Sequence, residues 1–132
     1  MKSARSAIFR SLFNMKWTTR IFQCVLAVAF LMFGFMKLST NPMQVEAFTV
    51  TYGYGLDAMY VVGVIELLAG IGLVIGFWKP RIAFYSAGII VIIMAGAMLT
   101  HVRSGQGMST AALPLIFLIL ALIVVLRRSK RA

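Results

Sequence analysis

Glu66 lies near the middle of the apolar run 57–77, and its position there requires a chemical explanation. If the run crosses a bilayer, an ionised carboxylate at that depth costs at least about 2.5–3.5 kcal/mol, so Glu66 must meet a partner among the other helices or carry a proton. The available partners are Lys37, which ends the preceding apolar run, and Thr100 with His101, which end the following one. A lysine stem is long enough to reach inward from such a position. These four residues form the candidate site.

Three roles are open to this group of residues. The first is an interhelical Lys–Glu or His–Glu tie that only fixes the packing of the helices. The second is a polar pocket that opens toward the outside and holds a quinone headgroup or another small polar ligand. The third is a proton or ion path, which needs more acidic and histidine residues than the chain offers. We favour the structural tie.

Other kinds of chemistry find little support in the residues. One histidine, one nearby carboxylate and scattered methionines do not supply a set of metal ligands, and no triad indicates nucleophilic catalysis. Cys24 is the only cysteine, so the chain has no C-x-x-C redox motif, and we interpret it as a small apolar residue between helices. We therefore expect no catalytic residue, no metal site and no intrinsic cofactor.

Four apolar runs supply the helices that position the site. The spans are predicted at residues 18–37, 57–77, 82–101 and 110–126. The first three are near the roughly 20 residues that cross a hydrocarbon core as a helix. Charged residues make up 12% of the chain, against about 25% in a soluble domain. The predicted fold is an all-α integral membrane four-helix bundle over 17–126, between a basic leader (1–16) and a basic tail (127–132).

The basic residues indicate the orientation of this bundle. Eleven of the 13 Lys and Arg residues lie on one side of the spans, and only Lys37 and Arg103 lie on the other. Because basic residues accumulate on the cytoplasmic side, both termini are predicted inside, in what we take to be a bacterial inner membrane. The net charge of +10 thus reflects topology and contact with lipid headgroups, not nucleic-acid binding. Aromatic residues mark the interfaces in the same sense, with Trp17 and Trp78 inside and Tyr52, Tyr54 and Tyr60 outside.

Two segments next to the first span are also predicted to have defined positions. The leader 1–16 alternates basic and apolar residues, and we expect it to lie on the cytoplasmic surface before the chain turns into the membrane. After the first span, Asn41 is typical of an N-cap, Pro42 of a first helical residue and Gln44 of a reciprocal capping partner. These residues predict a short amphipathic surface helix over 42–50.

Small residues on the spans predict how the helices pack. In lipid, where burying apolar surface gives helices little gain, close approach of their backbones supplies the attraction. We expect this packing within the chain, and an oligomer or partner surface is the alternative. The span 110–126 lacks small residues in such a pattern, so it is predicted to be the most lipid-exposed helix. The glycines assigned to helix packing are Gly63, Gly70, Gly72, Gly76 and Gly96.

Three strings of sequence carry a resemblance to a known family. They are Phe33-Gly34-Phe35-Met36-Lys37-Leu38, Gly63-x-x-Glu66-Leu67-x-x-Gly70-x-x-Leu73 and Gly96-Ala97-Met98-x-x-His101. Over residues 18–126 the chain resembles the DoxX and DoxX-like family of small four-helix membrane proteins. The resemblance implies that Lys37, Glu66 and His101 occupy the family's polar positions. The family is similar to the membrane subunits of thiosulfate:quinone oxidoreductase and to bacterial proteins that tie redox enzymes to the membrane, and a vertebrate relative resembling it acts as an assembly chaperone for acetylcholine receptors.

Two hypotheses about function follow. In the first, the protein is a non-catalytic accessory, scaffold or assembly component of a membrane complex, and the polar residues only lock the fold. In the second, it is a quinone-interacting subunit of an oxidoreductase, in which His101 and Lys37 bind a quinone oxygen and Glu66 handles the proton. We favour the first, because every electron-transfer centre must come from elsewhere. Both hypotheses imply partners besides lipid, either further copies of the chain or another membrane protein.

Overall fold

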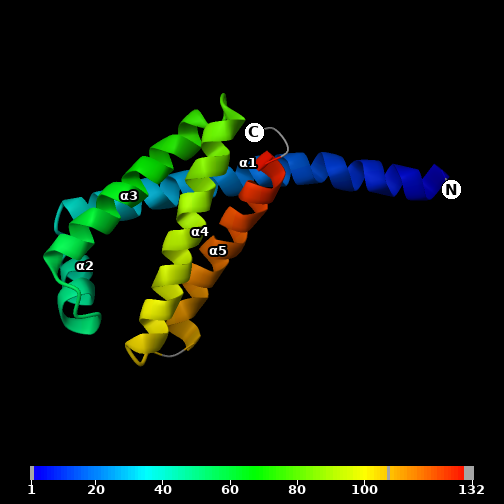
Figure 1. Cartoon of the computed structure of the whole chain (residues 1–132). Coiled ribbons are helices and arrows are strands. Elements are labelled where there is room, and N and C mark those ends of the chain that lie inside the picture. Colours follow the sequence, from blue (N-terminus) through cyan, green and yellow to red (C-terminus); the bar gives the residue numbers. More distant parts are fainter. Residues whose placement is uncertain (1, 107, 130–132) are drawn as a thin grey trace.

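The computed structural model describes residues 2–106 and 108–129, and within them the side chains of 3–7, 16–106 and 110–129. These ranges contain helices and their connections and no strand (Figure 1), which confirms the predicted all-α fold. The elements in chain order are α1 (Lys2–Leu38), α2 (Pro42–Glu46), the π-helix η1 (Ala47–Thr51), α3 (Leu56–Ile75), α4 (Pro80–Arg103) and α5 (Met108–Ser129).

Within the described ranges, four helices are long and apolar enough to cross a membrane. Their spans overlap the four predicted ones, so the chain is an integral membrane protein whose apolar side chains contact lipid. The span of α5 has the smallest buried share of the four, as its uniform Leu, Ile and Val content predicts. The spans are Lys16–Leu38, Leu56–Ile75, Pro80–Arg103 and Thr110–Ser129.

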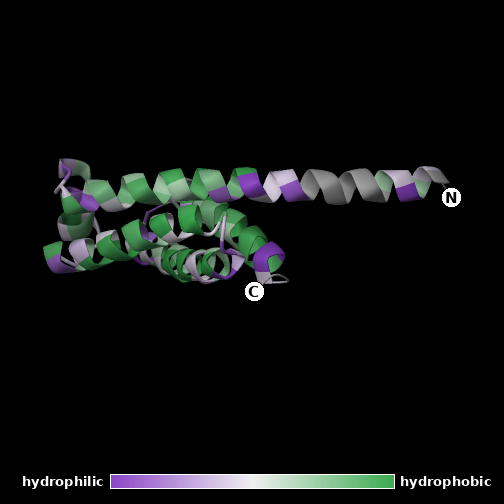
Figure 2. Ribbon diagram, turned by 90° about the horizontal axis from the view of Figure 1, so that it is seen from above, coloured by the Kyte–Doolittle hydropathy of each residue, from purple (hydrophilic) through white to green (hydrophobic). Residues whose placement is uncertain are grey.

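The leader does not turn onto a membrane surface as expected. It continues into the first span as one helix of 37 residues, α1, which is about 55 Å long at about 1.5 Å per residue. The physical reason is that α1 contains no proline and has no glycine before Gly34, so nothing interrupts its ladder of backbone hydrogen bonds. Its N-terminal part projects past the bundle as an arm (Figures 1 and 2).

The predicted short helix between the first two spans is present with its predicted N-cap, although its α-helical part ends at Glu46. Asn41 accepts a hydrogen bond from the backbone N–H of Met43 (3.0 Å), and Pro42 is the first helical residue. The reciprocal capping partner, Gln44, was wrongly assigned, because the N–H of Asn41 already donates to the carbonyl of Met36 (3.0 Å). The helix continues directly into η1, whose wider turns carry the chain back toward α3.

The long helices are arranged as two pairs. α1 packs most extensively on α3, and α4 on α5, while contacts of α3 with α4 and of α1 with α5 close the bundle. Most residues of the spans are hydrophobic (Figure 2), and large apolar side chains are found both in the core and on the exposed surface. The largest fully buried core residues are Phe30, Leu26, Met59, Leu73, Ile90 and Val124.

Glycines permit the closest approaches between these helices. A Cβ on Gly70 would lie 2.9 Å from Leu31 of α1, and one on Gly76 would lie 2.5–2.8 Å from atoms of Ala83 on α4. Gly63 and Gly72 lie equally close to neighbouring helices, as does Gly34, which we did not assign. The assignment of Gly96 to helix packing was wrong, because no other helix of the described part of the chain comes within 4 Å of the position of its Cβ.

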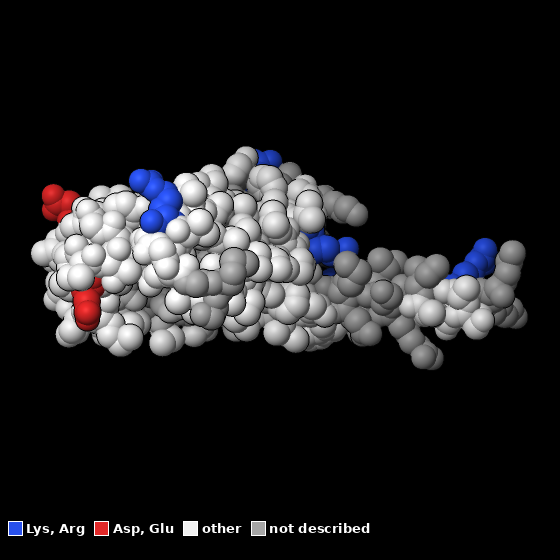
Figure 3. Space-filling model, turned by 90° about the horizontal axis from the view of Figure 1, so that it is seen from below, with Lys and Arg blue, Asp and Glu red and all other residues white. Residues whose placement is uncertain are grey.

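Charge distinguishes the two ends of the bundle. We call the end where α3 and α5 finish the basic end, and the opposite end, where α2 lies, the α2 end. In the view of Figure 3 the acidic side chains lie at one end, and the basic ones lie mostly toward the other end and along the arm. The basic end carries Arg20, Lys79, Arg81, Arg127 and Arg128, whereas Glu46, Asp57 and Arg103 lie at the α2 end.

A buried glutamine links three helices at the basic end. Gln23 of α1 is 0% exposed, and its Nε2 donates to the carbonyl of Leu73 on α3 (2.8 Å). Its Oε1 accepts a hydrogen bond from Nε of Arg128 on α5 (2.9 Å). The carbonyl of Leu73 is available for this bond because the N–H of Phe77 binds the carbonyl of Val74 instead, as α3 ends.

Candidate functional site

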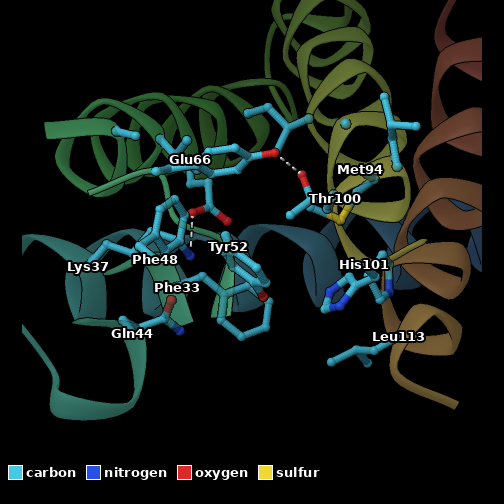
Figure 4. Close-up of a pocket in the computed structure, with 18 of the residues that line it drawn as sticks. Phe33, Lys37, Gln44, Phe48, Tyr52, Glu66, Met94, Thr100, His101 and Leu113 are labelled. Atoms are coloured by element: carbon cyan, nitrogen blue, oxygen red, sulfur yellow. Dashed lines mark hydrogen bonds and ion pairs between the residues drawn. The ribbon is translucent and has the colours of Figure 1, made fainter. Parts of the chain in front are cut away.

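The two helix pairs diverge toward the α2 end (Figure 1). A cavity of about 750 Å³ lies between them there, and Figure 4 shows residues that line it. Its size falls within the roughly 300–1,000 Å³ of ligand pockets in proteins. Most of its wall is apolar and includes Phe33, Val62, Ile93, Met94, Leu113 and Phe117. Its polar lining residues are Lys37, Gln44, Tyr52, Tyr54, Glu66, Thr100, His101 and Thr110.

Lys37 and Glu66 form a buried ion pair on the wall made by α1 and α3. Nζ of Lys37 lies 2.7 Å from Oε1 of Glu66, and the two residues are 7% and 2% exposed. The pair forms because Gly63, one turn before Glu66, has no side chain, so the Cβ of Lys37 can lie directly against α3. Each charge compensates the other in a setting where an isolated charge would be costly.

Aromatic rings enclose the lysine, whereas the carboxylate keeps capacity for another partner. The ammonium group of Lys37 lies 5.7 Å from the ring centroid of Phe33 and 5.8 Å from that of Phe48, within the range of cation–π contact. An ionised carboxylate has about four acceptor positions, and one ammonium group fills only part of them. Figure 4 shows the second oxygen of Glu66 turned toward the cavity.

The connection from η1 to α3 carries aromatic side chains across to α4. The ring of Tyr52 packs edge-on against Phe48 (5.4 Å) and against His101 (5.7 Å). The hydroxyl of Tyr54 shares a hydrogen bond with that of Thr100 (2.8 Å). Burial, and to a smaller extent the neighbouring Tyr54, raises the pKa of Tyr52, so its phenol remains a hydrogen-bond donor at neutral pH.

The four residues of the predicted site all line the cavity, but they lie on two different walls. Glu66 pairs with Lys37 on the wall of α1 and α3. Thr100 and His101 lie on the wall of α4, where Thr100 binds Tyr54 and Nδ1 of His101 forms a hydrogen bond with Oε1 of Gln106. The structure therefore shows a Lys–Glu tie, and the histidine faces the same cavity without joining that pair.

Sequence reasoning placed the tyrosines at the membrane interface and overlooked their part in the cavity. The signal that could have located them is the pair of glycines on either side of Tyr54, since glycine readily turns a chain back on itself. Gly53 and Gly55 have φ angles of 73° and 94° and direct this connection toward α4. Gln44 and Phe48 also line the cavity and were not assigned to the site.

The remaining chemical groups do not add a second reactive centre near the cavity. Among the described residues, no group of three His, Cys, Asp or Glu side chains could hold a metal ion. Cys24 was expected between helices, but it is exposed on the lipid-facing surface of α1. What the cavity provides is an apolar chamber with a carboxylate, an imidazole and hydroxyl groups at its margins.

Comparison with known proteins gives two matches. The profile of the DoxX-like family matches residues 21–124. The uncharacterized protein YdgD of Bacillus subtilis (strain 168) is 34% identical over 102 residues, which cover 76% of this chain and 89% of that protein. No solved structure gives a significant match. The matched range contains all four residues of the predicted site.

Proposed function

The chain belongs to the DoxX-like family, and from this premise we propose that it is a non-catalytic component of a membrane complex whose cavity holds a quinone. The observation that supports this proposal is the cavity of about 750 Å³, which combines apolar walls with a few polar groups at its margins. The scaffold and quinone hypotheses then become two aspects of one role. The protein holds the quinone, and a partner supplies the electrons.

A quinone suits the chemistry of the cavity. Its ring and tail are apolar, and its two carbonyl oxygens accept hydrogen bonds. Phe33 and Phe117 offer aromatic faces to a ring, and the protonated phenol of Tyr52 offers a donor. Nδ1 of His101 already donates to Gln106, so its Nε2 offers an acceptor for a hydroxyl of the reduced quinone. We assign the contact with a carbonyl oxygen to Tyr52 and not to Lys37, because Lys37 is committed to Glu66. The quinone would supply the redox chemistry, and Glu66 would exchange protons with it.

Quinone binding is tested with the purified chain in detergent and a short-chain quinone. We expect the quinone to raise the melting temperature, since a ligand that binds only the folded state stabilises it. His101→Ala should weaken binding of the reduced form, the quinol, about tenfold, as expected for loss of a hydrogen bond and its packing. The matched control is Arg103→Gln, two residues further along α4 and outside the cavity. A quinone that leaves the melting temperature of the wild type unchanged contradicts the proposal.

We also propose that both termini are cytoplasmic and that the membrane is a bacterial inner membrane. The basic end carries most of the positive charge, which supports its placement inside. Thr49→Cys at the α2 end and Ser129→Cys at the basic end test this in a Cys24→Ser background. A membrane-impermeant thiol reagent added to intact cells should label the first and not the second. The reverse pattern contradicts the proposed orientation.

The proposed role requires a partner, either further copies of the chain or another membrane protein. Large apolar side chains remain exposed on every span, so a protein partner could replace lipid on any of them. Native mass spectrometry after extraction in mild detergent should show an oligomer or a copurifying protein. A monomer with no copurifying protein contradicts this part of the proposal.

A further inference from the structure

The wall of the cavity on α4 faces two environments. Gly96 and Leu99 line the cavity and are also exposed on the surface of the bundle, Leu99 to 58%. Residues that are exposed both inward and outward mark an opening. Because Ala58 and Val62 of α3 line the same cavity, the opening lies between α3 and α4. Among the described residues, no side chain and no neighbouring helix lies within 4 Å of a Cβ on Gly96, so they leave the opening unobstructed there.

This opening is at membrane depth. Gly96 lies seven residues before Arg103, the last residue of α4, which places it about 10 Å inside the end of the span. Toward the basic end, the opening is closed where Gly72 and Gly76 bring α3 against α4. It therefore faces hydrocarbon and not water.

A hydrogen bond crosses the opening toward the α2 end. It joins the hydroxyl of Tyr54, in the connection before α3, to that of Thr100 on α4, and Figure 4 marks it with a dashed line at Thr100. Tyr54 lies in the connection whose glycines, Gly53 and Gly55, adopt positive φ angles. Breaking this bond would free the side chain of Tyr54, while the backbone of the connection stays held by hydrogen bonds from Tyr54 and Gly55 to the carbonyl of Phe48 (2.8 and 3.1 Å).

We propose that a ligand enters the cavity laterally from the bilayer, between α3 and α4. Gly96 lies at this entrance, and the Tyr54–Thr100 hydrogen bond crosses it and restricts passage. The ligand class is then an amphiphile dissolved in the bilayer. Its apolar body passes the entrance at Gly96, and its polar head reaches the margin of the cavity. Water-soluble molecules are excluded. The identity of the ligand as a quinone rests on the proposed function, whereas the route does not.

Another exposed lining residue, on α5, defines the competing route. Leu113, near the start of α5, is 53% exposed and lines the cavity on the far side from α3. Its side chain already occupies that position, in contrast to the empty space at Gly96. A bulky residue at 113 therefore tests the competing route in the same way that one at 96 tests the proposed route.

The experiment follows the modification of a cysteine inside the cavity, Val62→Cys, in a Cys24→Ser background reconstituted in phospholipid vesicles. A lipophilic N-alkyl maleimide should react faster than a charged, membrane-impermeant maleimide. Gly96→Phe should slow the lipophilic reagent about tenfold. The matched control is Gly88→Phe, on the same helix at a position that is also free of neighbours within 4 Å but outside the cavity. It should leave the rate unchanged, as should Leu113→Trp.

Removing the Tyr54–Thr100 hydrogen bond should increase the rate of modification of the cysteine inside the cavity. Thr100→Val and Tyr54→Phe each delete one partner of the hydrogen bond and should speed the lipophilic reagent about two- to tenfold. Equal rates for the two reagents overturn the proposed route. So does slowing by Leu113→Trp in place of Gly96→Phe, or equal slowing by Gly96→Phe and Gly88→Phe. Quinone binding at equilibrium in detergent is measured separately, so its failure refutes the proposed function and leaves the route standing.

Discussion

The helices approach one another closely at the basic end of the bundle and lie apart at the α2 end. At the basic end, Gly72 and Gly76 let α3 approach α4, and Gln23 joins α1, α3 and α5 through side-chain hydrogen bonds. At the α2 end, the same helices diverge around a cavity of about 750 Å³. The comparison teaches that small residues let the helices of this bundle close together and that large side chains hold them apart.

Three phenylalanines form the boundary between the closed and the open end. The rings of Phe30, Phe33 and Phe117 pack edge to face at centroid distances of 5.7–5.8 Å, a favoured arrangement for aromatic pairs. They join α1 to α5 and keep the two helices a ring's width apart. The cavity begins on the side of these rings that faces the α2 end, and Phe33 and Phe117 are part of its lining.

The largest expected effect lies at the open end, in the ion pair. Glu66→Ala leaves the buried ammonium group of Lys37 without its carboxylate and should destabilise the fold by about 3–5 kcal/mol. Glu66→Gln should cost much less, because the amide oxygen still accepts a hydrogen bond from Lys37. Unfolding in mixed micelles measures both.

The apolar double variant separates structure from function at this pair. Lys37→Met with Glu66→Leu should recover stability to within about 1 kcal/mol of the wild type, because the two charges are removed together. If Glu66 serves the quinone, this stable variant should still lose function. Equal stability of the wild type and Glu66→Ala would show that the pair does not hold the open end together.

The next effect tests the closed end. Gly76→Ala places a methyl group against the backbone of Ala83, which cannot move aside, and should cost about 1–3 kcal/mol. The matched control at the open end is Gly96→Ala, where the space is empty and the gain in helix propensity should stabilise by up to about 1 kcal/mol. Thermal unfolding in detergent compares the two. If both substitutions have the same sign, the contrast in packing between the ends is wrong.

A smaller effect separates two glutamines. Gln23→Leu removes the link between α1, α3 and α5 and leaves buried polar groups with fewer partners, at a cost of about 1–3 kcal/mol. Gln44→Leu, at the margin of the cavity, should change stability by less than about 0.5 kcal/mol. Denaturant titration of both variants ranks them. A larger loss for Gln44→Leu would mean that the α2 end is the more tightly held.

The smallest effect concerns pH. The pKa of Tyr52 is raised by burial, so between the pKa of the unfolded chain, near 10, and the higher pKa of the folded state, only the folded state keeps the proton. Stability should therefore fall as pH rises above about 10, and the change should be absent in Tyr52→Phe. Ultraviolet titration of the phenol checks the shift. A midpoint at or below the ordinary tyrosine value would contradict burial of this ring.

Much of the fold was predictable because membranes restrict what a helix can contain. The apolar runs located the spans, and the scarcity of carboxylates singled out Glu66, with Lys37 as one of its candidate partners. Contacts between distant side chains were not predictable. Arg128 was interpreted only as part of a basic tail, yet it reaches Gln23, 105 positions away in the chain. The same limit applies to Tyr54, since a tyrosine near a span end usually marks an interface.

The glycines show most clearly what a sequence pattern cannot predict, namely which small residues contact a neighbouring helix. Gly72, Gly76 and Gly96 are all glycines within apolar runs, and a small residue on a membrane helix normally indicates close packing. Which of them meets a neighbour depends on where the helix pairs diverge. That divergence depends on the large side chains between the pairs, which a pattern of small residues does not reveal.

The unbroken course of α1 gives the molecule a mechanical property. Gln23 ties α1 to its neighbours and acts as a fulcrum, with Lys37 about 21 Å away on one side and Lys2 about 32 Å away on the other. A stiff rod that tilts by about 5° around this point moves its tip by roughly 3 Å and Lys37 by roughly 2 Å in the opposite direction. Anything that pulls on the free arm outside the membrane thus exerts a torque on the wall that holds the lysine and its carboxylate.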